Sequence, residues 1–91
     1  MGSSVSSAEW AVRQAEGYVK QAEAHLRSMK EQRDFAKKNG MYKNSAKTYR
    51  SGDKVGTLYD SNVWGAERVL KERKAQLAEA KKRFSEAKKK K

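Results

Sequence analysis

Apolar residues recur alternately every four and three positions through the first third of the chain. They are Ala8, Val12, Ala15, Val19, Ala22, Leu26, Met29 and Ala36, with Arg33 as the one interruption. This spacing is typical of a helix that buries one stripe, here called its seam, against another helix. Ser6 stands three residues before Glu9, the arrangement of a capping box. The pattern predicts a helix over residues 8–37, after a flexible, serine-rich segment at residues 1–7.

A second seam of the same period occupies the last third of the chain. It comprises Val63, Ala66, Leu70, Leu77, Ala80, Phe84 and Ala87, again with one arginine, Arg73, within it. Asp60, Ser61 and Asn62 are suitable N-cap residues directly ahead of it. We therefore predict a helix over residues 63–87 and a polylysine tail at residues 88–91. Two roles are open for the seam arginines. Their stems cover the seam while the guanidinium groups reach water, or they fix register or bind an anion.

The two seams match each other best as an antiparallel hairpin. We align the two helices so that the numbers of facing residues sum to 99. In this register a small side chain meets a larger one, as in Ala36 with Val63 and Ala15 with Phe84. The same register brings opposite charges together in the pairs Glu9–Lys88, Glu16–Lys81, Glu23–Lys74 and Lys30–Glu67. Each exposed pair contributes about 0.2–1 kcal/mol, which helps to select orientation and register. The sequence predicts an all-α, single-domain, coiled-coil-like hairpin of two helices.

The connection over residues 38–62 is longer than a turn between two helices requires. Structureless loops of this length are uncommon in compact domains, so we expect partial order here. Tyr42, Ala46 and Tyr49 fall at helical spacing, which favours a short third helix. The stretch KTYRSGDKVGTLY fits a β-hairpin that turns at residues 51–53 equally well. Both alternatives remain open from the sequence.

Composition agrees with long helices in one small domain. Ala, Glu, Lys, Leu and Arg make up 46 of the 91 residues, and the chain contains no proline to interrupt a helix. The absence of cysteine excludes disulfides and thiolate metal sites. No apolar run approaches the roughly 18 residues of a membrane span. We expect a soluble, intracellular protein.

The net charge of +11 is distributed unevenly along the chain. Residues 1–36 are neutral, whereas residues 37–62 carry +4 and residues 63–91 carry +7. Cations that displace condensed counterions bind phosphates, and tyrosines among them can stack on bases. We therefore predict contact with nucleic acid, DNA or RNA, or with another polyanion. The expected contacts are Lys37, Lys38, Lys43, Lys47, Arg50 and Lys54, stacking by Tyr42 and Tyr49, and diffuse attraction by Lys88, Lys89, Lys90 and Lys91.

Docking to a protein is the first alternative function. Trp10 lies outside both seams, and Tyr18 belongs to a half-apolar strip beside the first seam. Exposed aromatic residues of this kind often anchor protein interfaces. Under this alternative, the hairpin is a small inhibitor, a regulator or an assembly subunit that docks on an acidic protein surface, as a homodimer or in a larger complex.

Attachment to a membrane is a second alternative. The start MGSSVS matches an acylation pattern at Gly2, and a lipid chain combined with a polybasic cluster can hold a protein at a membrane. A serine-rich leader explains the same residues more simply, so we do not expect a membrane partner.

Catalysis has little support in the sequence. His25 is the single histidine, and the predicted register places no nucleophile beside it. The chain lacks the glycine-rich phosphate loop of nucleotide-binding enzymes. We expect a binding protein without catalytic activity, cofactor or metal.

Overall fold

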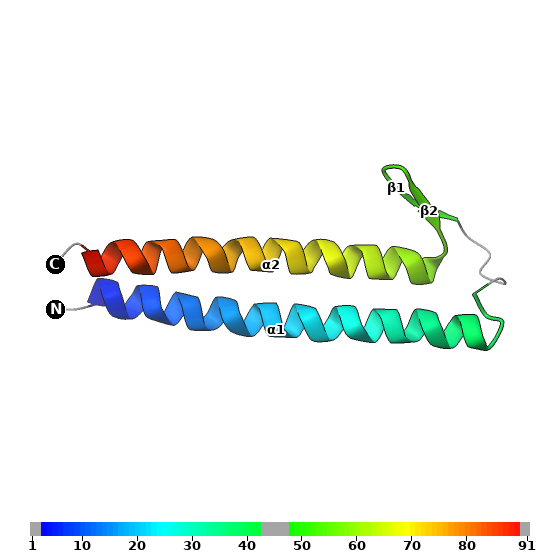
Figure 1. The fold of residues 1–91 in the computed structure, drawn as a ribbon, viewed down its shortest axis with the longest axis horizontal. Helices are drawn as coiled ribbons and strands as arrows, with labels where there is room; N and C mark the ends of the chain where they lie inside the picture. The colour runs from blue at the N-terminus through cyan, green and yellow to red at the C-terminus, as the bar shows by residue number, and fades with distance from the viewer. Residues whose placement is uncertain (1–2, 43–47, 90–91) are drawn as a thin grey trace.

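Two long antiparallel helices lie side by side in the computed structural model, which describes residues 3–42 and 48–89 (Figure 1). The elements are α1 (Ser3–Lys38), β1 (Tyr49–Ser51), β2 (Lys54–Gly56) and α2 (Leu58–Lys89). The molecule measures 60 × 24 × 12 Å. The predicted all-α hairpin is confirmed, and the connection contains a β-hairpin. Neither described helix has a stretch apolar and long enough to cross a membrane.

Both helices extend beyond the residues that the seams predicted. α1 begins at Ser3 instead of residue 8, and α2 begins at Leu58 instead of residue 63. Val5 lies seven residues before Val12 and is half-buried, so it adds one more position to the first seam. Ser6 therefore lies inside α1 and does not cap it. Glu9 instead forms an exposed ion pair of 2.9 Å with Arg13.

The two seams form the core between α1 and α2. Its buried apolar residues are Ala15, Val19, Ala22, Ala36, Val63 and Ala66. The remaining predicted seam positions are all half-buried. No large side chain among the described residues is fully buried, because only two layers of helix meet. Such a thin core buries little apolar area, and the ends of the hairpin therefore contribute importantly to its stability.

The register of the two helices differs from the predicted one. Contacts across the pair join Tyr18 to Arg73 and Arg33 to Asp60, whose residue numbers sum to 91 and 93 instead of 99. α2 is therefore displaced along α1 by about one heptad. Because both seams repeat every seven residues, this displacement again places small residues opposite larger ones.

The flanking charges were too weak a guide to choose between these registers. None of the four predicted interhelical charge pairs is formed. The ion pairs between described residues are Glu9–Arg13, Arg33–Asp60 and Glu79–Arg83. In the displaced register, Val5 lies opposite the last turns of α2. Both helices can therefore pack against each other along their full length.

Two glycines with positive φ shape the turn end of the hairpin. Gly40, with φ of 74°, ends α1, and the Met41 N–H donates to the Ala36 carbonyl at 2.9 Å, as in a Schellman motif. Gly52, with φ of 58°, starts the tight turn between β1 and β2. Both strands contact α2, so the β-hairpin is held against the start of that helix.

Candidate polyanion-binding surface

The buried carboxylate of Asp60 joins the connection to both helices. Asp60 is 8 % exposed and lies in the first turn of α2. Its Oδ2 accepts hydrogen bonds from the Tyr42 hydroxyl and, at 3.0 Å, from the Thr57 N–H. Its Oδ1 lies 3.7 Å from Nη1 of Arg33. One side chain therefore ties α1, the residues after it and the start of α2 together.

Thr57 and Asp60 form a capping box at the start of α2. The Asp60 N–H donates to Oγ1 of Thr57 at 3.4 Å, while the Asp60 carboxylate accepts the Thr57 N–H in return. The Thr-x-x-Asp spacing was visible in the sequence. The prediction of a helix starting at residue 63 instead assigns Asp60 as a cap residue, which the structure corrects.

The Asp60 contacts shift two pKa values in opposite directions. Burial alone would raise the pKa of Asp60, but hydrogen bonds from Tyr42 and Thr57 and the charge of Arg33 outweigh it and lower that pKa. The hydrogen bond to Asp60, followed by burial and the negative charge of Asp60, raises the pKa of Tyr42. The folded protein therefore favours an ionised carboxylate beside a protonated phenol.

Gly56 provides the space that Asp60 occupies. A Cβ at Gly56 would lie 2.5 Å from Oδ2 and 2.8 Å from Cβ of Asp60. We predict that Gly56→Ala lowers the free energy of unfolding by about 1–3 kcal/mol, because Asp60 must leave its hydrogen bonds. Urea unfolding followed by circular dichroism measures this. Gly17→Ala is the matched control, since its Cβ meets nothing within 4 Å; equal stability of the two variants would contradict the prediction.

The β-hairpin presents cations beside α2 at the turn end. Arg50 and Lys54 project from β1 and β2 and are exposed. The Lys54 Nζ lies 6.0 Å from the centroid of the Trp64 ring. A small pocket of about 160 Å³ lies between the hairpin and α2, and its lining includes Arg50, Trp64 and Arg68. Arg68 cannot be recognised as a site residue from the sequence, because only the folded β-hairpin brings Arg50 to the same pocket.

The other predicted contact residues that the structure describes lie at the same end of the molecule. Lys37 and Lys38 form the exposed last turn of α1, and the Lys37 Nζ lies 5.0 Å from the Tyr42 ring centroid. Tyr42 is half-buried with its hydroxyl bonded to Asp60, and Tyr49 is half-buried in β1. Stacking by these tyrosines stays a prediction. Lys43 and Lys47 lie outside the described residues.

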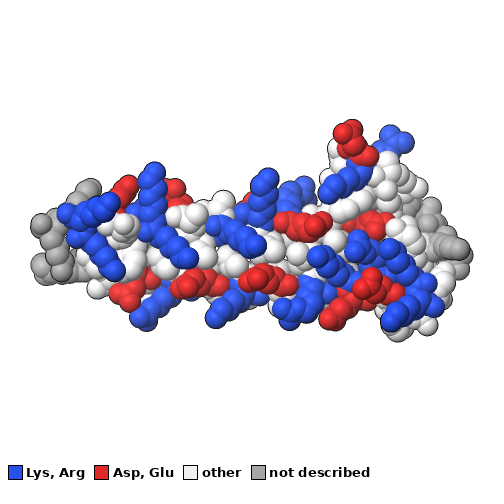
Figure 2. Space-filling view, in the orientation of Figure 1, with Lys and Arg blue, Asp and Glu red and all other residues white. Residues whose placement is uncertain are grey.

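The described part of the basic tail is the end of α2, which lies at the opposite end from the turn, beside the start of α1 (Figure 1). Lys88 and Lys89 are exposed at the end of α2, and the Lys88 Nζ lies 4.3 Å from the Phe84 ring centroid. Lys90 and Lys91 lie outside the described residues. Figure 2 shows lysines and arginines along the whole visible face, with acidic side chains interspersed among them. Tip and tail are therefore two separate basic regions.

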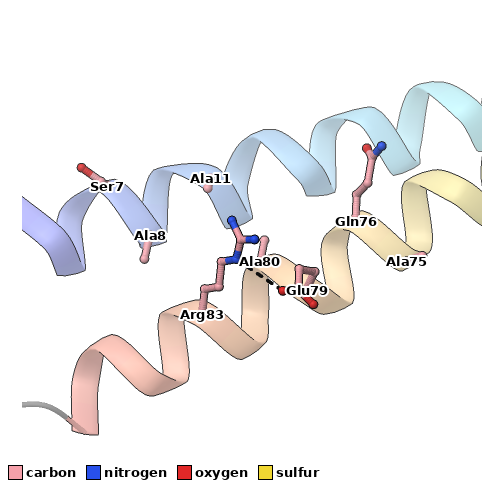
Figure 3. Close-up of a pocket in the computed structure, with 8 residues that line it drawn as sticks. All are labelled: Ser7, Ala8, Ala11, Ala75, Gln76, Glu79, Ala80 and Arg83. Carbon is pink, nitrogen blue, oxygen red and sulfur yellow. Dashed lines mark ion pairs between the residues drawn. The ribbon is translucent and has the colours of Figure 1, made fainter.

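The predicted protein-interface residues both lie on α1. Trp10 is 61 % exposed. Tyr18 is 42 % exposed, and the Arg73 guanidinium lies 4.6 Å from its ring centroid. At the end of the molecule away from the turn, the two helices flank a shallow groove of about 630 Å³. Its lining includes Ala8, Ala11 and Ala80 (Figure 3).

Within residues 3–42 and 48–89, no three His, Cys, Asp or Glu side chains are grouped as metal ligands. His25 is exposed on α1. No family model, curated protein or solved structure matches the chain.

Proposed function

We propose that this protein binds nucleic acid, or a similar polyanion, through the basic tip at its turn end. The tip comprises Lys37, Lys38, Arg50 and Lys54 among the described residues. The observation that carries the proposal is that these four cations lie together at one end of the molecule, and none of them has a carboxylate within 4.0 Å in the described part of the chain. They are thus free to exchange small counterions for phosphates.

The structural order of the tip supports the same proposal. Arg50 and Lys54 occupy neighbouring strands of a hydrogen-bonded hairpin that rests on α2. A folded hairpin presents its cations in one arrangement, so binding loses less conformational entropy than it would with a disordered loop. The tail cations Lys88 and Lys89 add a second attractive region near the other end of the 60 Å molecule.

Binding to a mixed-sequence oligonucleotide tests this function directly. Fluorescence anisotropy of a labelled oligonucleotide at low salt should show saturable binding, which weakens as salt is added. No binding at low salt would refute the proposal. Competition by polyglutamate, which offers carboxylates instead of phosphates, separates nucleic-acid binding from attraction to any acidic chain.

Docking to a protein is a second candidate function, favoured by the exposure of Trp10. A ring that is 61 % exposed makes little contribution to this fold, yet it can anchor an interface. Trp10→Ala should leave unfolding unchanged within about 0.5 kcal/mol. Under this candidate, a stoichiometric protein retained by the wild type from nuclease-treated lysate is lost by the variant. Retention of the same protein by both would exclude Trp10 as the anchor.

A further inference from the structure

We propose that the pocket between the β-hairpin and α2 binds a single phosphate group. Arg50 and Ser51 of β1 line it from one side, and Ser61, Trp64, Gly65 and Arg68 of α2 line it from the other. This inference deepens the proposed function and rests on it for the source of the phosphate, which is then the backbone of a nucleic acid. A free phosphate ion offers the same chemistry.

The charges at the pocket favour an anion. Two arginines from different elements, Arg50 and Arg68, line the same small space. Arginine presents paired N–H donors that match the oxygens of a phosphate. No acidic residue in the described part of the chain lines the pocket. None of the ion pairs between described residues uses either arginine.

The polar groups at the pocket are also available to a ligand. Ser51 and Ser61 add hydroxyl groups, and no hydrogen bond between described side chains uses them. The Ser61 N–H already donates to the Thr57 carbonyl at 3.0 Å. The arginines and hydroxyls, rather than the start of α2 by itself, therefore provide the binding groups.

The size of the pocket selects a phosphate group over a whole nucleotide. Its volume of about 160 Å³ is below the roughly 300–1,000 Å³ of pockets that enclose drug-sized ligands. Trp64 forms a wall, and the Lys54 ammonium lies 6.0 Å from the centroid of its ring. Lys54 thus adds positive charge beside the pocket.

Gly65 offers a way to fill the pocket without damaging the fold. A Cβ at Gly65 would meet no described atom within 4 Å apart from its chain neighbours and the adjacent backbone of its own helix, and alanine is a better helix former than glycine. Gly65→Ala should therefore narrow the pocket while it strengthens α2. Gly17→Ala makes the same substitution in α1, also with open space around the new Cβ, far from the pocket.

In the first experiment, isotope-labelled protein is titrated with inorganic phosphate. A titration with chloride at equal ionic strength is the reference. Nuclear magnetic resonance should show phosphate-specific shifts at the amides of Ser51, Ser61 and Gly65. The phosphate affinity should fall at least tenfold in Gly65→Ala and stay unchanged in Gly17→Ala. Shifts equal to those with chloride, or equal affinity in the two variants, would overturn the proposal.

The second experiment repeats the oligonucleotide titration with the same two variants. A backbone phosphate in the pocket predicts about three- to tenfold weaker binding by Gly65→Ala than by Gly17→Ala. If both variants bind the oligonucleotide equally and phosphate gives no specific shifts, the pocket proposal fails and the proposed function stands. If no variant binds the oligonucleotide but phosphate occupies the pocket, the proposed function fails and the pocket binds free phosphate.

Discussion

Asp60→Ala should lower the free energy of unfolding by about 2–4 kcal/mol, a large loss for so thin a core. The substitution removes the capping box with Thr57 and leaves the Tyr42 hydroxyl without its acceptor. It also leaves the half-buried Arg33 guanidinium without its carboxylate, although the Arg33 Nε already lacks a hydrogen-bond partner. Urea unfolding followed by circular dichroism measures the loss.

Asp34→Ala is the matched control for this prediction. Asp34 is exposed on α1, and no ion pair between described residues uses it, so its removal should change stability by no more than about 0.5 kcal/mol. Tyr42→Phe isolates one hydrogen bond and should cost about 0.5–1.5 kcal/mol. Equal stability of Asp60→Ala and Asp34→Ala would show that Asp60 does not hold the turn end together.

The pH dependence of unfolding provides an independent test of the Asp60 contacts. Because folding lowers the pKa of Asp60, its contribution is complete above the unfolded pKa of about 3.9 and disappears as pH falls through the folded pKa. The raised pKa of Tyr42 gives a contribution that is complete below about pH 10 and is lost as pH rises through the folded pKa. The free energy of unfolding of Asp60→Ala should show neither this acidic loss nor this alkaline loss.

The sequence was sufficient to predict the helical hairpin but could not fix its register. The alternation of small and large seam residues recurs after seven positions, so two registers one heptad apart have similar cores. The contact that distinguishes them is the ion pair between Arg33 and Asp60, which fixes how far the start of α2 lies along α1. The interruption of the seam by Arg33 is thereby explained, because its guanidinium contacts a buried carboxylate instead of reaching water alone.

The candidate site was only partly accessible to sequence reasoning. Charge along the chain identified Arg50 and Lys54, because a local excess of cations is visible without a fold. The pocket with Trp64 and Arg68 depends on the β-hairpin resting against α2, and periodicity left helix and hairpin equally possible there. Trp64 lies beside the β-hairpin and lines this pocket.

Neutralising the four cations of the tip should weaken binding to nucleic acid strongly. With Lys37, Lys38, Arg50 and Lys54 all replaced by Gln, the dependence of log affinity on log salt should become shallower by about three units. This follows from about 0.7–0.9 units for each of four lost phosphate contacts. The affinity itself should fall about 10²- to 10³-fold near 0.1 M salt. Oligonucleotide titrations between about 50 and 200 mM salt measure both quantities.

A variant with the same loss of net charge elsewhere distinguishes a binding site from general attraction. Arg13, Lys20, Arg27 and Lys30 are four exposed cations of α1, and their replacement by Gln also removes four positive charges. If the tip contacts the phosphates, this control should change the salt slope by less than about one unit, since long-range attraction is screened within about 10 Å at 0.1 M salt. Equal losses in the two variants would instead assign binding to the overall charge of the molecule, and the ordered tip would then have no special part in it.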